Sequence, residues 1–170
     1  MIFNKHILMA TSIIATIATP VVANAATGNT STATGAASAT IIAPLVLTHT
    51  AAATLNFGKF TTGTGGAVVV TSGGVGSVTG DVGFVPGSTN SADAFGLTGD
   101  VSRAFGIITT AGAITNGSSS MAFITAPSAV AGTTSASGAA TFTVGGTLTV
   151  GTGLVAGSYS GTYTATVVYQ

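Results

Sequence analysis

The sequence contains no cysteine, and it carries only three Lys or Arg and three Asp or Glu among 170 residues. Without cysteine the chain has no disulfide to hold it together, although a core of this size is stable without one. A structural zinc site of the usual type is also excluded, because after residue 25 only His49 is a soft or borderline ligand.

The scarcity of charge excludes further classes of partner. Nucleic acid requires a basic patch that neutralises phosphates, and docking on anionic lipid requires clustered Lys or Arg. After residue 25 the charged residues are Lys59, Arg103, Asp81, Asp93 and Asp100, which sum to 2 − 3 = −1. The surface is therefore expected to consist of Thr, Ser, Gly and Asn, which suits a subunit with a buried or repetitive exterior.

Residues 1–25 have the features of a secretory signal peptide. Lys5 and His6 precede an apolar run, and Ala23-Asn24-Ala25 fits the small-x-small cleavage rule, so the mature chain is predicted to start at Ala26. A membrane anchor is the competing interpretation, but the run is short and rich in threonine. The protein is therefore predicted to be exported, with no integral membrane segment after cleavage.

The remaining chain divides into a short extension and one domain. Residues 26–38 contain no large apolar residue, so they are predicted to form a flexible N-terminal extension. Residues 39–170 are predicted to form an all-β domain of short strands separated by glycine-based turns. The predicted strands before the terminal segment are residues 39–48, 54–60, 67–71, 75–85, 92–99, 104–110 and 120–125. This spacing favours an immunoglobulin-like antiparallel β-sandwich over a barrel.

The last thirty residues show the strongest pattern. Phe142, Val144, Leu148 and Val150 alternate with threonines, and a second alternation runs from Tyr159 through Tyr163 and Val167 to Tyr169. A period of two with threonine on one side is typical of a half-buried antiparallel strand. Because residues 151–157 are rich in glycine, these two runs are predicted to form a terminal β-hairpin. Phe142, Val144, Leu148, Tyr163 and Val167 are predicted to be buried.

No pattern of residues predicts catalysis or a cofactor. His49 lacks a nucleophile or carboxylate in any sequence motif, so it is interpreted as a polar residue at a strand end. Asp81, Asp93 and Asp100 match no calcium loop and are interpreted as solvated turn residues. Asp100 and Arg103 are placed to pair across a turn. The protein is therefore predicted not to be an enzyme, and no catalytic, cofactor or metal residues are assigned.

Two glycine-containing motifs and the aromatic residues have structural interpretations. Gly63-Thr-Gly-Gly66 precedes a strand rather than a helix, so it is predicted to be a hairpin turn and not a phosphate-binding loop. Asn116-Gly-Ser118 fits a glycan acceptor but is better explained as an Asn-Gly turn. Most aromatic residues alternate with Val, Leu and Ile, which predicts core positions rather than a glycan-binding face. The set is Tyr159, Tyr163, Tyr169, Phe57, Phe95, Phe105, Phe123 and Phe142.

Three further segments form a recognisable set: Leu55-Asn-Phe-Gly58, the run from Phe142 to Leu148, and the run from Gly157 to Tyr163. They resemble an exported bacterial family known as domain of unknown function 4402. The chain also has an aromatic residue next to last, Tyr169, and a glycine about fourteen places from the end, Gly157. In these two features it resembles subunits of chaperone–usher pili of the archaic and spore-coat-U-like types. The sequence departs from them in lacking a cysteine pair and in lacking large apolar residues in its extension.

The pilin resemblance implies a pilin-like sandwich and a mode of assembly. The C-terminal strand would be captured by a periplasmic chaperone, and the extension of a neighbouring copy would later complete the sheet. The residues implied for this strand are Gly157, Tyr159, Tyr163, Val167 and Tyr169. The leading hypothesis is a non-enzymatic structural subunit of a surface appendage or coat, with copies of itself and a chaperone and usher as partners. The alternative is a self-complete monomeric β-sandwich for adhesion or binding.

Overall fold

The computed structural model describes residues 28–170, so the predicted signal peptide and the first two residues of the predicted extension lie outside the described residues. The chain divides into two compact units, Met1–Thr40 and Ile41–Gln170. The described part of the first unit contains no strand. Residues 28–44, here called the arm, form no regular structure, and their side chains are exposed.

The second unit confirms the all-β prediction, since every regular element in residues 28–170 is a strand and the strands pair antiparallel. Among the described residues there is accordingly no helix that is long and apolar enough to span a membrane. In chain order the strands are β1 Val46–His49, β2 Phe60–Thr61, β3 Gly66–Val70, β4 Gly76–Gly80, β5 Gly83–Phe84, β6 Asp93–Thr98, β7 Ala104–Thr109, β8 Gly112–Asn116, β9 Ser119–Pro127, β10 Ala131–Thr133, β11 Ala139–Val150, β12 Ser160–Thr162 and β13 Ala165–Tyr169.

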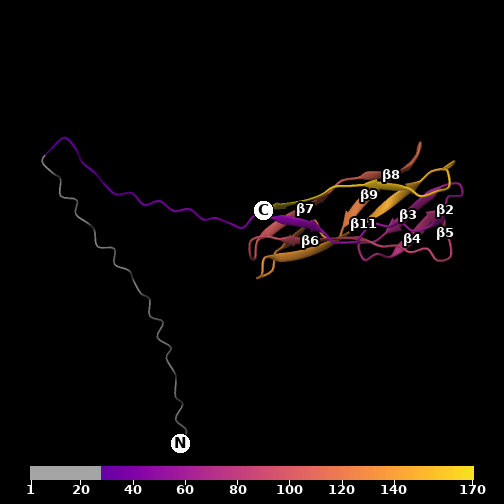
Figure 1. Ribbon diagram of the computed structural model, residues 1–170, viewed down its shortest axis with the longest axis horizontal. Helices are drawn as coiled ribbons and strands as arrows, with labels where there is room; N and C mark the ends of the chain where they lie inside the picture. The colour runs from indigo at the N-terminus through magenta and orange to yellow at the C-terminus, as the bar shows by residue number, and fades with distance from the viewer. Residues whose placement is uncertain (1–27) are drawn as a thin grey trace, which may run out of the picture. The chain divides into compact units, whose positions relative to one another are not determined.

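Strand β11 lies at the centre of an eight-stranded sheet (Figure 1). Its first half, up to Val144, pairs with β6, its second half, from Gly146, pairs with β3, and β9 pairs along its other edge. The strand therefore changes partner at the glycine pair Gly145-Gly146. A Cβ at Gly145 would lie 2.3 Å from the Val70 carbonyl oxygen, and one at Gly146 would lie 2.6 Å from that of Ile124. Only glycine permits these close backbone approaches.

Three strands of this sheet continue into a second, three-stranded sheet. The order β9-β8-β12 at one edge of the large sheet reappears as β10-β7-β13 in the small one. Only Thr110 and Ala111 separate β7 from β8, and only Tyr163 and Thr164 separate β12 from β13. The three chain segments thus form one bent ribbon that contributes to both sheets, which is how sandwich corners are commonly made.

Threonines hold the bend of this ribbon. The Thr125 hydroxyl donates to the Thr109 hydroxyl at 2.8 Å and contacts the Thr110 carbonyl at 3.0 Å. The Thr164 amide donates to the Thr110 hydroxyl at 3.0 Å, and the Thr110 amide donates to the Thr164 carbonyl at 3.0 Å. These bonds satisfy backbone groups that the regular ladder leaves unpaired where the strands turn.

The hydrophobic core has two parts, and one of them joins the large and the three-stranded sheets. In one part Phe95, Phe142 and Val144 of the large sheet pack with Phe105 and Ile107 of the small sheet. The other part contains Phe57, Val68, Met121, Phe123 and Leu148. Side chains of both sheets therefore share one interior, an arrangement compatible with the predicted immunoglobulin-like sandwich.

The predicted core residues are mostly confirmed. Phe142, Val144 and Leu148 are buried, whereas Tyr163 and Val167 are only half-buried. The aromatic set is likewise mostly core, since its five phenylalanines are buried and its three tyrosines half-buried. Tyr163 packs against both parts of the core.

The predicted terminal hairpin is wrong. β11 does not pair with the terminal segment; β12 pairs with β8 and β13 pairs with β7. The alternation of both runs is real, but alternation fixes which side chains face inward and does not fix which strand is the neighbour.

Several element boundaries also differ from the predictions. The first strand begins at Val46 rather than residue 39, and residues 54–60 form only an isolated bridge from Asn56 to Ser91 before β2 begins. β8 and β10 were not predicted. The Asn116-Gly117 turn between β8 and β9 is confirmed, with a positive φ of 58° at Gly117. The turn at residues 63–66 joins β2 and β3, which pair with different strands, so it is not a hairpin.

Replacing Phe142 with alanine should destabilise the fold by about 3–5 kcal/mol, because the substitution removes a buried ring that stacks on Phe95 and leaves a cavity. Thr143→Ala, on the outward face of the same strand, should cost well under about 1 kcal/mol. Urea denaturation of both variants measures the difference. Equal shifts in the midpoint would show that the inward and outward faces of β11 are misassigned.

Gly145→Ala should destabilise the protein by about 1–3 kcal/mol, since the added methyl group meets the backbone of residues 70–72 and not a flexible side chain. Gly96→Ala in neighbouring β6 is the matched control, because nothing lies within 4 Å of its Cβ position. Thermal unfolding of the two variants should separate them by several degrees. A Gly145→Ala protein as stable as Gly96→Ala would contradict the close approach at the partner change.

Candidate functional site

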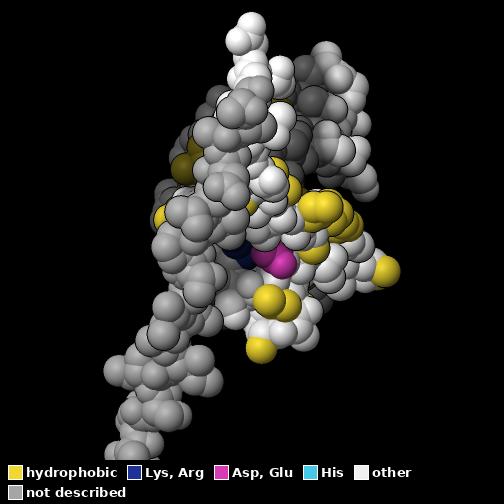
Figure 2. Space-filling view, turned by 90° about the vertical axis from the view of Figure 1, so that its left-hand side faces the viewer, with side chains coloured by type: hydrophobic (Ala, Val, Ile, Leu, Met, Phe, Trp, Pro, Cys, Tyr) yellow, Lys and Arg dark blue, Asp and Glu magenta, His cyan; other side chains and the backbone are white. Residues whose placement is uncertain are grey.

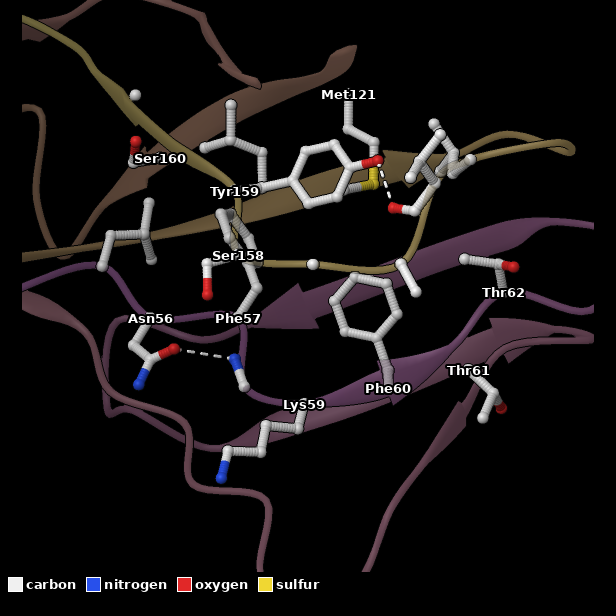
Figure 3. A pocket seen from close by; sticks show the side chains of 18 of the residues that line it. Asn56, Phe57, Lys59, Phe60, Thr61, Thr62, Met121, Ser158, Tyr159 and Ser160 are labelled. Carbon is white, nitrogen blue, oxygen red and sulfur yellow. Dashed lines mark hydrogen bonds between the residues drawn. The ribbon is translucent and has the colours of Figure 1, made fainter. Parts of the chain in front are cut away.

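A groove of about 850 Å³, lined by both apolar and polar residues, lies between residues 54–63 and residues 154–161. Figure 3 shows Phe57 and Phe60 on the first bank, Tyr159 on the second, and Met121 behind them. The other apolar residues of the lining are Leu55, Ile114, Leu154, Val155 and Ala156. The groove is thus an opening in the side of the core, bounded by two irregular segments.

Side-chain hydrogen bonds shape the first bank. The Asn56 Oδ1 accepts from the Gly58 amide at 2.9 Å, as Figure 3 shows. Asn90 Nδ2 donates to the Phe57 carbonyl at 2.8 Å, and the Lys59 amide donates to Ser88 Oγ at 2.8 Å. Because side chains occupy these backbone groups, the segment does not form the continuous strand that its sequence predicts.

The second bank leads into the edge of the large sheet. The Tyr159 hydroxyl donates to the Val155 carbonyl at 2.8 Å, which fixes the ring as a wall of the groove. β12 follows directly and is the last strand in the sheet order, so only β8 pairs with it. The groove therefore combines several apolar side chains with a strand that has one free edge, which is the combination that strand addition requires.

A smaller cavity of about 400 Å³ shares Leu55, Phe57 and Ile114 with the groove. Its polar group is the buried carboxylate of Asp93, which is 5% exposed. His49 Nε2 lies 2.6 Å from Asp93 Oδ1, and the Tyr163 hydroxyl donates to Oδ2 at 2.8 Å. The Ala94 amide donates to Oδ1 at 2.9 Å. The cluster thereby connects the end of β1, the start of β6 and the bend between β12 and β13.

The pKa of Tyr163 is raised well above its ordinary value. Burial is the largest cause, because it disfavours the charged phenolate, and the hydrogen bond to Asp93 and the negative charge of that carboxylate add to it. The hydroxyl therefore stays protonated and keeps donating to Asp93 throughout the physiological range.

These positions correct one prediction and confirm another. Asp93 is buried and is not a solvated turn residue. His49 is a polar residue at a strand end, as predicted, since it is the last residue of β1, and the Asp93 carboxylate lies beside it. The sequence indicated only that both side chains lie on the inward faces of their strands, because His49 follows Leu45 and Leu47 at a spacing of two and Asp93 precedes Phe95 and Leu97 at the same spacing. No serine, cysteine or lysine lines the cavity, whereas Thr54, Thr162 and Tyr163 contribute hydroxyl groups to its lining.

The residues assigned to the terminal strand take separate places. Gly157 and Tyr159 line the groove, and Tyr163 lies at the bend. Val167 packs into the core from β13. The Tyr169 hydroxyl accepts from the Asp100 amide at 2.6 Å and donates to the Ala43 carbonyl at 3.1 Å. The terminal segment is therefore held at both of its ends.

The other charged candidates do not form a site. No group of three or more potential metal ligands occurs in residues 28–170. Asp81 accepts from the Thr64 amide at 2.9 Å. Asp100 and Arg103 form no ion pair with each other, contrary to the prediction, because the Arg103 guanidinium lies over the Tyr169 ring, 5.9 Å from its centroid.

Comparison with known proteins gives one match. The family model described as domain of unknown function (DUF4402) matches residues 47–169. No curated protein and no solved structure matches the chain. The matched range includes both banks of the groove and the terminal segment up to Tyr169.

Raising the pH above about 10, the ordinary pKa of tyrosine, should destabilise the fold through Tyr163. The unfolded chain then loses a proton that the folded chain keeps, so the stability present below this pH falls as the pH rises. Urea midpoints between about pH 8 and pH 11 measure this slope.

Tyr163→Phe should flatten the alkaline slope, and Tyr159→Phe serves as the control because its hydroxyl contacts a carbonyl and no carboxylate. The Tyr163→Phe protein should also be less stable at pH 7 by about 1.5–3 kcal/mol, the usual contribution of a hydrogen bond to a charged group. Identical slopes for both variants and the unaltered protein would show that the Tyr163–Asp93 bond is absent in solution.

Proposed function

Since the chain belongs to the DUF4402 family, whose function is unknown, we propose a role for it from its groove, its arm and its surface: it is a non-enzymatic structural subunit of an extracellular appendage or coat. It is pilin-like and is assembled by strand addition after export, with a periplasmic chaperone and usher as partners in transit. The groove beside β12 is the observation that carries this proposal.

The groove has the chemistry of a strand acceptor. Leu55, Phe60 and Leu154 in its lining are only half-buried, so part of their apolar surface is open to solvent. Burying apolar surface contributes about 25 cal/mol per Å². The free edge of β12 offers backbone groups that an incoming extended segment pairs with, while alternate side chains of that segment enter the groove.

The arm has the chemistry of a donor. Its residues are exposed, and the structure extends the exposed stretch to Pro44, beyond the predicted boundary at residue 38. The added residues include Ile41, which is 96% exposed, and Ile42, which is 38% exposed. Large apolar side chains, absent from residues 26–38, are therefore available to fill the groove of another copy.

The position of the groove in the domain favours assembly into a chain of subunits. Tyr169 fixes Ala43 beside the β6–β7 turn. Figure 1 shows β6, β7 and the C-terminus at one end of the domain and β2 and β5, next to the groove, at the other. A contact between different surfaces of two identical subunits repeats without closing unless rotation closes a ring, so it produces filaments.

A self-complete monomeric module for adhesion or binding is the second candidate. One observation favours it: β13 pairs with β7 over five residues, and its last tyrosine makes two hydrogen bonds within its own chain. The terminal strand thus needs no partner to be satisfied. The two candidates differ in whether the arm of one copy enters the groove of another.

Cysteine cross-linking tests the proposal directly, because the chain has no cysteine of its own. Ile41→Cys places a thiol on the arm, and Ser158→Cys places one on the groove bank, where Figure 3 shows the residue. Under oxidising conditions the double variant should form a ladder of covalent multimers that reduction returns to monomer.

Ile41→Cys combined with Thr166→Cys is the matched control, since Thr166 is exposed on β13 away from the groove. A monomer that migrates faster after oxidation would mean that the arm fills its own groove, which supports the self-complete module. Ladders of equal strength in both double variants, or in neither, would overturn the strand-addition proposal.

A further inference from the structure

The charged residues of the domain are distributed unevenly. Among residues 28–170 the strands carry no Lys, Arg, Asp or Glu except the buried Asp93. The broad outward face of β11 presents Thr141, Thr143, Thr147 and Thr149 instead. The remaining four charged residues all lie in turns or irregular segments, so the flanks of the domain have no charge with which to steer a partner.

Two of the four charges lie where the arm leaves the domain. Asp100 and Arg103 are in the β6–β7 turn, and Tyr169 connects that turn to Ala43. Figure 2 shows that end with a basic and an acidic side chain close together among exposed hydrophobic side chains. Val101 in this turn is 55% exposed.

The β6–β7 turn is rigid. Thr134, which is 2% exposed, donates its hydroxyl to the Asp100 carbonyl at 2.5 Å and accepts from the Arg103 amide at 2.8 Å. Ser102 adopts a positive φ of 51°. A turn held this firmly presents the Arg103 side chain in a defined direction, and ordering it costs little entropy on binding.

Arg103 has unused hydrogen-bonding capacity. It makes no ion pair with any carboxylate of residues 28–170. A guanidinium has five N–H donors suited to a carboxylate, so this group is incomplete within one copy of the described chain.

The other two charges lie in the half of the domain that contains the groove. Lys59 lines the groove, and Asp81 lies between β4 and β5, where it contacts residues 63–64 at the end of the same lining. Asp81 is exposed, and only its Oδ2 accepts a hydrogen bond within the described residues. Its Oδ1 therefore remains available to a donor from outside.

We propose that the β6–β7 turn of one copy docks at the groove end of the next copy, with Arg103 paired to the partner copy's Asp81 and with Asp100 facing its Lys59. This inference rests on the proposed strand addition, because insertion of the arm is what brings these two ends together. It adds a second contact, which sets the orientation and rate of docking. Each end carries one cation and one anion, so the ends complement each other in only one of the two possible pairings.

Charge exchange tests this pairing. Arg103→Asp alone and Asp81→Arg alone should each slow formation of the Ile41→Cys/Ser158→Cys ladder about tenfold at low salt, since each places like charges opposite one another. The combined Arg103→Asp/Asp81→Arg protein should recover to within about threefold of the starting rate, and about 0.5 M salt should reduce all the differences.

Conservative variants separate charge from folding. Asp81→Asn keeps an acceptor for the Thr64 amide and removes only the charge, so it should still slow the ladder. Arg103→Lys keeps the charge and should retain most of the rate. Unfolding temperatures of all variants identify any that fail to fold.

The two proposals fail in different ways. Absence of any ladder contradicts strand addition itself. A ladder that forms at the same rate in every charge variant, or single reversals that the double exchange does not rescue, would overturn the Arg103–Asp81 contact and leave strand addition standing.

Discussion

The close backbone approach at Gly145-Gly146 is the constraint on which the architecture depends. β11 can pair with β6, β3 and β9 only because no side chain separates the backbones at the point where its partner changes. Both halves of the core are built on the inward side chains of this strand, with Phe142 and Val144 in one half and Leu148 and Val150 in the other. One strand, β11, thereby contributes buried side chains to both hydrophobic clusters.

The bent ribbon covers the part of the core that lies between the two sheets. Each of its three strands turns from one sheet into the other, and Tyr163 lies at the turn of the terminal segment with its hydroxyl on the buried Asp93 carboxylate. A buried charge is costly unless it is fully hydrogen-bonded, and His49, Ala94 and Tyr163 together meet this need. The position of the last strand is therefore specified by a polar contact as well as by packing.

The surface of the domain carries very few charged side chains. Besides threonine, alanine and glycine, the strands expose only a few large apolar side chains, such as Ile108 and Ile124. The charged turns and the groove are therefore among the features by which a partner distinguishes one region from another. The groove lies beside the free edge of β12, and the arm leaves the domain at the opposite end from β2 and β5. The proposed strand addition uses both features, since it repeats one contact along a series of copies.

The sequence by itself determined the all-β class, the inward faces of β11 and of the terminal strand, and the Asn116-Gly117 turn. These follow from local rules, since side chains alternate along any strand and Gly117 accepts a positive φ. Pairing was decided only in the tertiary structure. Leu148 faces inward whether its neighbour is β3 or β12, so alternation could not exclude the hairpin. Asp93 contacts His49, 44 positions away in the sequence, and Tyr163, 70 positions away. The groove lies between two segments that are about a hundred residues apart in the sequence. Such contacts depend on how the sheets fold over each other, and no short-range pattern encodes them.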